Sequence, residues 1–229
     1  MTEEIQNGTC EEYYDNGQLQ VKCTYKDGEL DGPYEEYYQN GQLLEKSTYK
    51  DGLLNGPYEC YYANGQSRIK CTYQDDKFDG LYEEYYENGQ PHKKCTYQNG
   101  VLNGLYEEYY ENGQLFEKCI YQNDQADGLY VAYRENGQLW MRFNFKGGKY
   151  EGVWENYHTN GQIEEKRTYK NDKLDGPYER YDSNGKLKSI AYWKEGKEIT
   201  EPECESHAKK VTSHTKKMNM KQGKNVNQR

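Results

Sequence analysis

The Asn-Gly dipeptide recurs every 24 residues along most of this chain, and this spacing constrains the fold more than any other feature of the sequence. It occurs at Asn16-Gly17, Asn40-Gly41, Asn64-Gly65, Asn88-Gly89, Asn112-Gly113, Asn136-Gly137, Asn160-Gly161 and Asn184-Gly185. Turn-forming pairs with the same spacing lie between them, at Asp27-Gly28, Asp51-Gly52, Asp75-Asp76, Asn99-Gly100, Asn123-Asp124, Gly147-Gly148, Asn171-Asp172 and Glu195-Gly196. Short turns of both kinds are typical of β-hairpins, so the sequence predicts about eight repeats of two antiparallel strands each.

The Asn-Gly pair predicts a type I′ turn, because both central residues of that turn need a positive φ. A two-residue loop at Asn40-Gly41 gives the cross-strand pairs Tyr38/Leu43, Tyr37/Leu44, Glu36/Glu45, Glu35/Lys46 and Tyr34/Ser47. The same register places Glu opposite Lys in six hairpins: Glu11/Lys22, Glu35/Lys46, Glu59/Lys70, Glu83/Lys94, Glu107/Lys118 and Glu155/Lys166. It also matches two apolar pairs, Cys60/Ile69 and Ala132/Met141. A slip of one residue would scramble both patterns.

The second turn continues the sheet into the next repeat, with Tyr49 opposite Leu54 and Ser47 opposite Gly56. The two strands of a repeat differ in length, so equivalent positions either drift along the sheet or stay aligned through bulges at Gly56 and its equivalents. We expect one face, the core, to collect Gly32, Tyr34, Tyr38, Leu43, Ser47 and Tyr49. The reverse face would carry Tyr37, Leu44 and the Glu-Lys pairs.

The composition allows only a thin core. Leu, Ile, Val and Phe make up 30 of the 229 residues, whereas tyrosine alone contributes 27. Tyrosine buries a large ring and keeps its hydroxyl at the surface, so a Tyr-rich single layer can fold where few aliphatic residues are present. Each hairpin cannot bury its own face, and its stability should come from its neighbours.

Charge divides the chain into an acidic body and a basic tail. The net charge is −9, and residues 206–229 carry seven Lys or Arg and no Asp or Glu. The acidic body is expected to repel nucleic acid and anionic membranes and to attract basic proteins. The start, MTEEIQNG, does not resemble an export signal, and seven cysteines without such a signal indicate free thiols in a reducing compartment. We therefore expect a soluble cytoplasmic protein.

Residues 31–42 (DGPYEEYYQNGQ) and 103–114 (NGLYEEYYENGQ) resemble the MORN repeat, particularly the variant in bacterial antitoxins of the YwqK type. The resemblance covers about residues 8–198. It implies an all-β fold, an elongated single-layer antiparallel meander of about eight 24-residue hairpin repeats used as a protein-binding scaffold. For the YwqK-type members it implies toxin neutralisation. The expected division is an N-terminal extension (residues 1–7), the MORN-like array (8–199) and a basic disordered tail (200–229).

No catalytic, metal or cofactor site is expected from the sequence. The carboxylates recur in most hairpins, whereas acid-base catalysis needs two carboxylates in different environments at one place. Cysteines at equivalent positions, such as Cys71 and Cys95, lie two strands apart, roughly 9–10 Å, too far to share one ion. Cys10 is expected directly opposite Cys23, and the sequence leaves open whether these two thiols form a disulfide.

The outward-facing tyrosines are the expected functional feature, because tyrosine anchors interfaces at low entropic cost. A single-layer sheet exposes both faces, so the sequence leaves open which face binds. The expected protein-binding residues are Tyr37, Tyr61, Tyr85, Tyr109, Tyr133, Trp140 and Tyr157. The sixth and seventh repeats depart most from the others, through Arg134, Trp140, Phe143, Trp154 and His158, with Pro91 as a further departure. Partner-specific contacts are expected there.

Two functions fit these features. The first is an antitoxin or immunity-type protein that binds and neutralises a protein toxin, which is basic if an acidic surface is to occupy it. The alternative is a structural or membrane-proximal scaffold that organises other proteins and touches anionic surfaces only through the basic tail. No nucleic acid is expected on the repeat array, and the oligomeric state is open.

Overall fold

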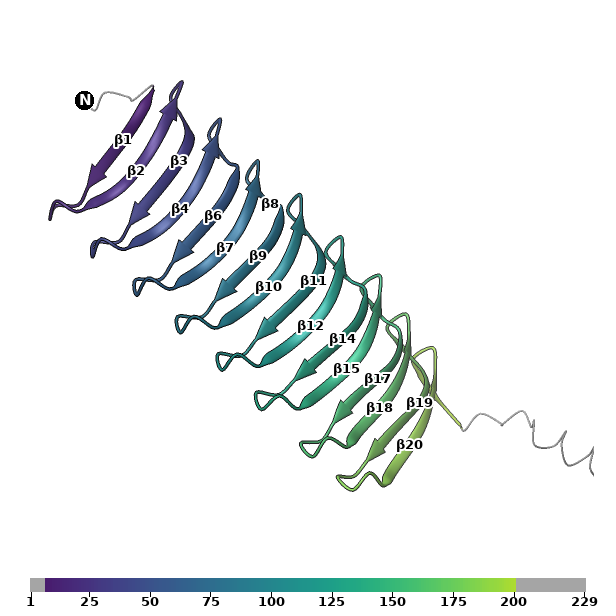
Figure 1. Cartoon of the computed structure of the whole chain (residues 1–229). Coiled ribbons are helices and arrows are strands. Elements are labelled where there is room, and N and C mark those ends of the chain that lie inside the picture. The colour runs from purple at the N-terminus through teal and green to yellow at the C-terminus, as the bar shows by residue number, and fades with distance from the viewer. Residues whose placement is uncertain (1–6, 201–229) are drawn as a thin grey trace, which may run out of the picture.

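The computed structural model describes residues 7–200, which form a single antiparallel sheet of 21 strands (Figure 1). The first eleven strands are β1 (Gly8–Tyr13), β2 (Leu19–Lys26), β3 (Glu29–Tyr37), β4 (Leu43–Lys50), β5 (Leu53–Leu54), β6 (Gly56–Tyr61), β7 (Ser67–Gln74), β8 (Lys77–Phe78), β9 (Gly80–Tyr85), β10 (Pro91–Gln98) and β11 (Val101–Tyr109). The remaining strands are β12 (Leu115–Gln122), β13 (Gln125–Ala126), β14 (Gly128–Tyr133), β15 (Leu139–Lys146), β16 (Lys149–Tyr150), β17 (Gly152–Tyr157), β18 (Ile163–Lys170), β19 (Lys173–Tyr181), β20 (Leu187–Lys194) and β21 (Lys197–Ile199). The expected all-β meander of hairpin repeats is confirmed.

The hairpins stand side by side in chain order and twist progressively along the array (Figure 1). The Asn-Gly turns lie in a row along one long side of the array, and the second set of turns lies along the opposite side. Within residues 7–200 there is no helix long and apolar enough to cross a membrane. The expected N-terminal extension and basic tail lie outside the described residues, apart from residues 7 and 200.

The Asn-Gly turns are not of the expected type I′. Gly41 has a φ of 82°, but Asn40 is not among the residues with positive φ. The Gly41 amide donates to the Tyr38 carbonyl at 2.8 Å, and the Tyr38 amide donates to the Gln42 carbonyl at 2.7 Å. These bonds describe a type I turn followed by a glycine bulge, a three-residue hairpin loop. The register near the turn therefore shifts, and Tyr37 pairs with Leu43 rather than Leu44.

The register away from that turn is confirmed. All six expected Glu-Lys pairs lie directly opposite each other, as do Cys60/Ile69, Ala132/Met141 and Cys10/Cys23. At the second set of turns both central residues have positive φ, as at Asp27 (53°) and Gly28 (85°). A type I′ turn therefore occurs there, where the loop has two residues.

Bulges keep the repeats aligned, one of the two alternatives left open by the sequence. Tyr25 pairs with Leu30, but Cys23 pairs with Tyr34, so the register shifts by two residues around Gly32, whose φ is 116°. The predicted pairing of Ser47, the residue equivalent to Cys23, with Gly56 is therefore wrong, because it requires a strand without a bulge. Because each bulge absorbs the offset, residues 24 apart occupy the same height on the sheet. Each repeat position thus forms a straight column across the array.

The Tyr34 face, the side of the sheet that carries Tyr34 and its equivalents, holds most of the buried side chains. Its fully or nearly buried residues are Cys23, Ser47, Cys60, Cys71, Cys95, Cys119, Ala132 and Phe143. Aromatic rings pack in clusters beside them, for example Tyr73 on Phe78 at 4.7 Å and Phe78 on Tyr82 at 5.2 Å between centroids. This face is the expected core, except that Leu43, expected here, pairs with Tyr37 and therefore lies on the reverse face.

Leu44 was expected on the reverse face, and that expectation is wrong. Two residues at its repeat position, His92 and Phe116, pack against Tyr86 and Tyr110 at 4.5 Å and 5.1 Å between ring centroids. His92 also lies 3.5 Å from the carboxylate of Glu84, on the Tyr34 face. The bulge after the Asn-Gly turn rotates this position onto the Tyr34 face.

Consecutive repeats are joined by a hydrogen bond that cannot be predicted from the strand pairing within one hairpin. The Tyr38 hydroxyl donates to the Tyr61 carbonyl of the next repeat at 2.8 Å, and the residue at that position does the same in each of the first five repeats. In the sixth and seventh repeats Arg134 Nη2 donates to Tyr157 O at 2.8 Å, and His158 Nε2 lies 3.1 Å from Tyr181 O. Because a carbonyl only accepts, His158 carries its proton on Nε2. Arg134 and His158 thus depart from the repeat in residue type but keep the donor.

Tyr86→Phe is expected to destabilise the array modestly, because it removes the donor to Tyr109 O and keeps the ring on His92. One lost hydrogen bond that leaves a part-buried carbonyl unpaired costs about 1 kcal/mol, or a fall of about 2–4 °C in the melting temperature. Thermal unfolding followed by circular dichroism measures it. Arg134→Tyr is the matched control, since it keeps a donor and should melt near the wild type. Equal melting of Tyr86→Phe and wild type would show that the bond contributes nothing.

Candidate protein-binding surface

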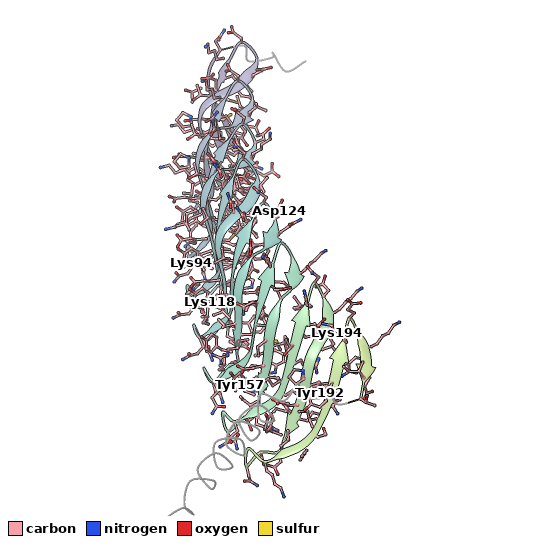
Figure 2. The ribbon with its side chains drawn as sticks, turned by 90° about the vertical axis from the view of Figure 1, so that its right-hand side faces the viewer. Lys94, Lys118, Asp124, Tyr157, Tyr192 and Lys194 are labelled. Atoms are coloured by element: carbon pink, nitrogen blue, oxygen red, sulfur yellow. The ribbon has the colours of Figure 1, made fainter. Side chains whose placement is uncertain are left out.

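The reverse side of the sheet carries alternating charges, and we call it the ladder face. Its central column runs Glu11, Lys22, Glu35, Lys46, Glu59, Lys70, Glu83, Lys94, Glu107, Lys118, Val131, Arg142, Glu155, Lys166, Glu179, Ile190. Most lysines therefore stand between two glutamates, one on each neighbouring strand. Lys94 Nζ lies 2.9 Å from Glu83, and Lys94 and Lys118 project from the same side of the sheet (Figure 2). The column is nearly charge-balanced.

The expected tyrosine column lies beside this ladder, and its hydroxyls donate to it. Tyr37 donates to Glu35 at 2.7 Å and Tyr109 to Glu107 at 2.8 Å, and Tyr61 and Tyr157 make the same bond to Glu59 and Glu155. The hydrogen bond to Glu35, with burial, raises the pKa of Tyr37 to about 12. The rings are therefore held in place before any partner arrives.

The structure brings six of the seven expected binding residues together and separates the seventh. Tyr37, Tyr61, Tyr85, Tyr109, Tyr133 and Tyr157 share the ladder face, where successive side chains of this column stand two strands apart. Trp140 is at the repeat position of Leu44, and its ring lies under the guanidinium of Arg134 at 5.7 Å. It belongs with the residues of the Tyr34 face, for the same bulge-related reason as His92.

An exposed aliphatic stripe on the ladder face was not expected. Five of its side chains are roughly half exposed: Leu81 (54 %), Leu105 (46 %), Ile120 (51 %), Leu129 (50 %) and Val153 (41 %). Leu105 lies directly opposite Ile120. The sequence signal was the replacement of Gly-Pro in the early repeats, as at Gly32-Pro33, by Gly-Leu or Gly-Val in the middle ones.

The ladder breaks where the stripe is most apolar. Val131 replaces the expected glutamate between Lys118 and Arg142 and is 6 % exposed. Residues at i, i+2 and i+4 of a strand share a face, so Leu129, Val131 and Tyr133 join the stripe to the tyrosine column across the ladder. Tyr133 also lacks the carboxylate that its equivalents bond. The middle of the ladder face thus has an apolar area whose exposed part is aliphatic, with Val131 buried beneath it, and exposed apolar patches mark interaction sites.

Arg142 and Glu155 border this patch. Arg142 Nε lies 2.5 Å from Glu155 Oε2, and the Glu155 side chain is 9 % exposed. Burial alone would raise the pKa of Glu155, but hydrogen bonds from Tyr157 and Arg142 outweigh it and hold the pKa below its usual value. Glu155 is therefore a fixed negative charge next to the apolar area.

Metal-ligand residue types and thiols both occur among the described residues. Within residues 7–200 no three His, Cys, Asp or Glu side chains are grouped as metal ligands. Their six cysteines are free thiols. Burial raises the pKa of Cys23, Cys95 and Cys119, and that of Cys71 to about 12, so these thiols stay protonated and weakly nucleophilic at neutral pH.

The fold and this surface define a class of protein, a repeat module in which stacked hairpins present extended faces. Seven segments match the MORN repeat variant family: residues 6–27, 30–51, 54–75, 78–99, 102–123, 150–171 and 174–195. These segments make up most of the chain, so the protein belongs to that family. No curated protein sequence matches the chain significantly. Residues 126–147, between the fifth and sixth matched segments, contain Val131, Tyr133 and Trp140, so the repeat that carries the apolar patch is also the one that departs from the family pattern.

Proposed function

We propose that this protein is a non-catalytic module that binds another protein through the middle of its ladder face. The observation that supports it is the apolar area of Leu105, Ile120 and Leu129, which are about half exposed, with Val131 buried beside them. Within residues 7–200 all strands belong to one sheet, so no second layer of strands covers this face. Rigid aromatic rings beside exposed aliphatic residues are the usual anchors of protein interfaces. The charged ladder on both sides would form a polar rim.

The partner we propose is a basic protein toxin, which the module neutralises by covering its working surface. The net charge of −9, despite the seven basic residues of the tail, supports a basic partner. Opposite net charges speed association, so the association rate should fall steeply as salt is raised. A rate that does not respond to salt would remove the electrostatic part of this proposal.

Val131→Glu is the variant that tests the surface, because it repairs the ladder without disturbing the fold. The new carboxylate would lie between Lys118 and Arg142 and would accept a hydrogen bond from Tyr133, as in the other repeats. We expect normal folding but a loss of partner binding of about tenfold or more, since the variant introduces a charge into the apolar area next to Leu129. Capture from the native host identifies the partner, and titration calorimetry measures its affinity.

Two comparisons complete the experiment. Tyr13→Ser changes the same tyrosine column at the far end of the array, where Tyr13 is 57 % exposed, and should bind like the wild type. The captured protein is then expressed in the host with each variant: the wild type and Tyr13→Ser should restore growth, and Val131→Glu should not. Equal affinity of Val131→Glu and wild type would rule out the ladder face, and a partner that is harmless when expressed alone would rule out the antitoxin role.

The second candidate function is the membrane-proximal scaffold, which the basic composition of residues 206–229 favours. Deleting those residues separates the two functions. A scaffold held by its tail would lose its place at anionic membranes, whereas an antitoxin would still bind its partner and restore growth.

A further inference from the structure

The array ends in two open strand edges that lie at opposite ends of the molecule (Figure 1). At one end is β1, which pairs only with β2 among the described strands. At the other end is β20, whose outer edge pairs with β21 only through Tyr192, Trp193 and Lys194. The outer edge of the rest of β20, Leu187–Ala191, has no strand beside it within residues 7–200. Unpaired edges of this kind are templates for strand addition.

The last strand of the array ends at the repeat position just before the one at which the first strand begins. Within the array, each second strand is followed by a first strand that starts just after the turn, as Glu29–Tyr37 follows β2. At the end of the array, Lys197–Ile199 occupy the same positions within the repeat as residues 29–31. The sequence then continues Thr200-Glu201-Pro202 where a repeat would have Gly-Pro-Tyr. At the start, Gly8–Tyr13 correspond to positions 32–37. The first strand therefore continues the repeat from the position at which the last strand stops.

We propose that copies of this chain associate head to tail, with β1 of one copy completing the strand that β21 of another copy begins. The joint would repeat the pairing seen between β2 and β3, where Val21 faces Glu36, Lys22 faces Glu35 and Cys23 faces Tyr34. Carried to the ends of the array, this register places Ser189 opposite Glu12, Ile190 opposite Glu11 and Ala191 opposite Cys10 of the next copy. The occupant of the open edge is thus a second copy of the same chain.

The chemistry of the two edge strands is complementary. β20 (LKSIAYWK) carries two lysines and no carboxylate, and β1 (GTCEEY) carries two glutamates and no basic residue. Leu187 and Ile190 are 45 % and 42 % exposed, and strand addition would cover them. The open edge also borders a depression of about 240 Å³ lined in part by Arg180, Ser189 and Ala191.

Two further features of the C-terminal edge favour the addition of another strand. Trp193 Nε1 is buried and has no hydrogen-bond partner among the described residues, a state that costs free energy unless a further group supplies an acceptor. Arg180 is next to Ser189 in the column that Glu12 of the added copy would extend. The Arg180 guanidinium already donates to the Tyr178 hydroxyl and lies 3.1 Å from Glu165, and the added carboxylate would approach it from the other side, across the small Ser189.

A head-to-tail joint uses two different surfaces, so each added copy leaves the same two edges free. Such a heterologous contact produces a series of oligomers rather than a closed dimer, unless the rotation closes a ring. Pairing of two identical edges would instead stop at a dimer. The size distribution therefore distinguishes this proposal from symmetrical edge pairing.

A site-specific cross-link tests the register. In the full-length double variant Cys23→Ser, Cys204→Ser, position 23 carries the residue found at the equivalent position Ser47. The native Cys10 then has no neighbouring thiol, and residues 200–229 have no cysteine. Adding Ala191→Cys places a second thiol opposite Cys10 of the next copy, at a distance typical of disulfides. After oxidation with diamide, we expect a ladder of dimers, trimers and higher species on a non-reducing gel. Ile190→Cys in the same background is the matched control, because its side chain points to the other face, and it should give no ladder.

Sedimentation velocity of the reduced wild type completes the test, with circular dichroism to verify that each variant is folded. We expect the average mass to rise with concentration beyond that of a dimer, and Glu12→Lys to shift this rise to at least tenfold higher concentration. A wild type that stays monomeric at all concentrations would overturn the proposal, as would equal cross-linking of Ala191→Cys and Ile190→Cys. A covalent dimer from the Cys23→Ser, Cys204→Ser background alone would show pairing of two β1 edges and would also overturn it.

Discussion

The folded protein is expected to keep most of its tyrosines protonated up to about pH 11 and then to lose its sheet abruptly. The structure raises the pKa of Tyr37, Tyr61, Tyr73, Tyr85, Tyr97, Tyr109 and Tyr157 to about 12. It raises the pKa of Tyr34, Tyr58, Tyr82, Tyr106 and Tyr130 further. The main cause is burial on the two faces of the sheet, joined by hydrogen bonds and proximity to glutamates; for Tyr37 the bond to Glu35 comes first.

The direction of the effect follows from proton linkage. A tyrosine whose pKa is raised on folding stabilises the folded state fully below its unfolded pKa, near 10, and this contribution is lost as the pH rises toward the folded pKa. At pH 11 each such tyrosine lowers the free energy of unfolding by about 1 kcal/mol, with partial exposure taken into account. Twelve tyrosines of this kind together approach the whole stability of an ordinary domain, about 5–15 kcal/mol.

Two signals recorded in one alkaline titration test this prediction. Tyrosinate absorbance should stay low and then rise together with the loss of the far-ultraviolet circular dichroism of the sheet. In denaturant the same chain should titrate gradually near the ordinary tyrosine pKa, which serves as the control. Gradual titration near pH 10 with the sheet intact would show that the hydroxyls are not held by the fold.

Most of the sheet register could be predicted from the sequence because the register leaves a charge pattern. The pairing of two strands can be predicted when residues directly opposite each other have opposite charges or are both apolar. Six Glu-Lys pairs and two apolar pairs meet this condition. The pattern also survives the error at the Asn-Gly turn, since the bulge lies between Glu36 and Tyr37 and the pairs farther from the turn keep their partners.

The predicted turn type is wrong because the Asn side chain makes hydrogen bonds that hold a different turn. In a type I′ turn Asn40 would supply a positive φ, but here its side chain accepts a hydrogen bond from the Gln42 amide at 2.9 Å and donates to the Ala63 carbonyl of the next repeat at 3.2 Å. The second contact crosses between repeats, and so does the bond from the Tyr38 position. Reasoning on one hairpin at a time cannot find a contact whose acceptor lies 23 residues away.

The candidate site shows the same limit. The tyrosine column on the ladder face follows from strand alternation, whereas Trp140 was placed with it only because it is a departure from the repeat. Its true face depends on the bulge after the turn. The aliphatic stripe is visible in the sequence as Gly-Leu in place of Gly-Pro, but its exposure depends on the absence of a second layer over residues 7–200.

Gly104→Val is expected to be among the most destabilising single substitutions in the array. Gly104 forms the bulge at the start of its hairpin with a φ of 127°, a conformation that valine adopts only under strain. A Cβ at this position would lie 3.2 Å from the Thr96 Cβ of the preceding strand, and the valine methyl groups would crowd it further. Strain and overpacking together should cost about 3–5 kcal/mol, a fall of about 10 °C in the melting temperature.

Leu105→Val is the matched control for Gly104→Val, because valine already occupies the equivalent exposed position at Val153. It should change the free energy of unfolding by less than about 0.5 kcal/mol. Denaturant unfolding of both variants measures the difference. In a nearly one-dimensional array the loss should also be local, so amide exchange should speed up in β10 to β12 and change little in β18 to β20. Uniform acceleration across the chain would instead show that the eight hairpins unfold as one cooperative unit.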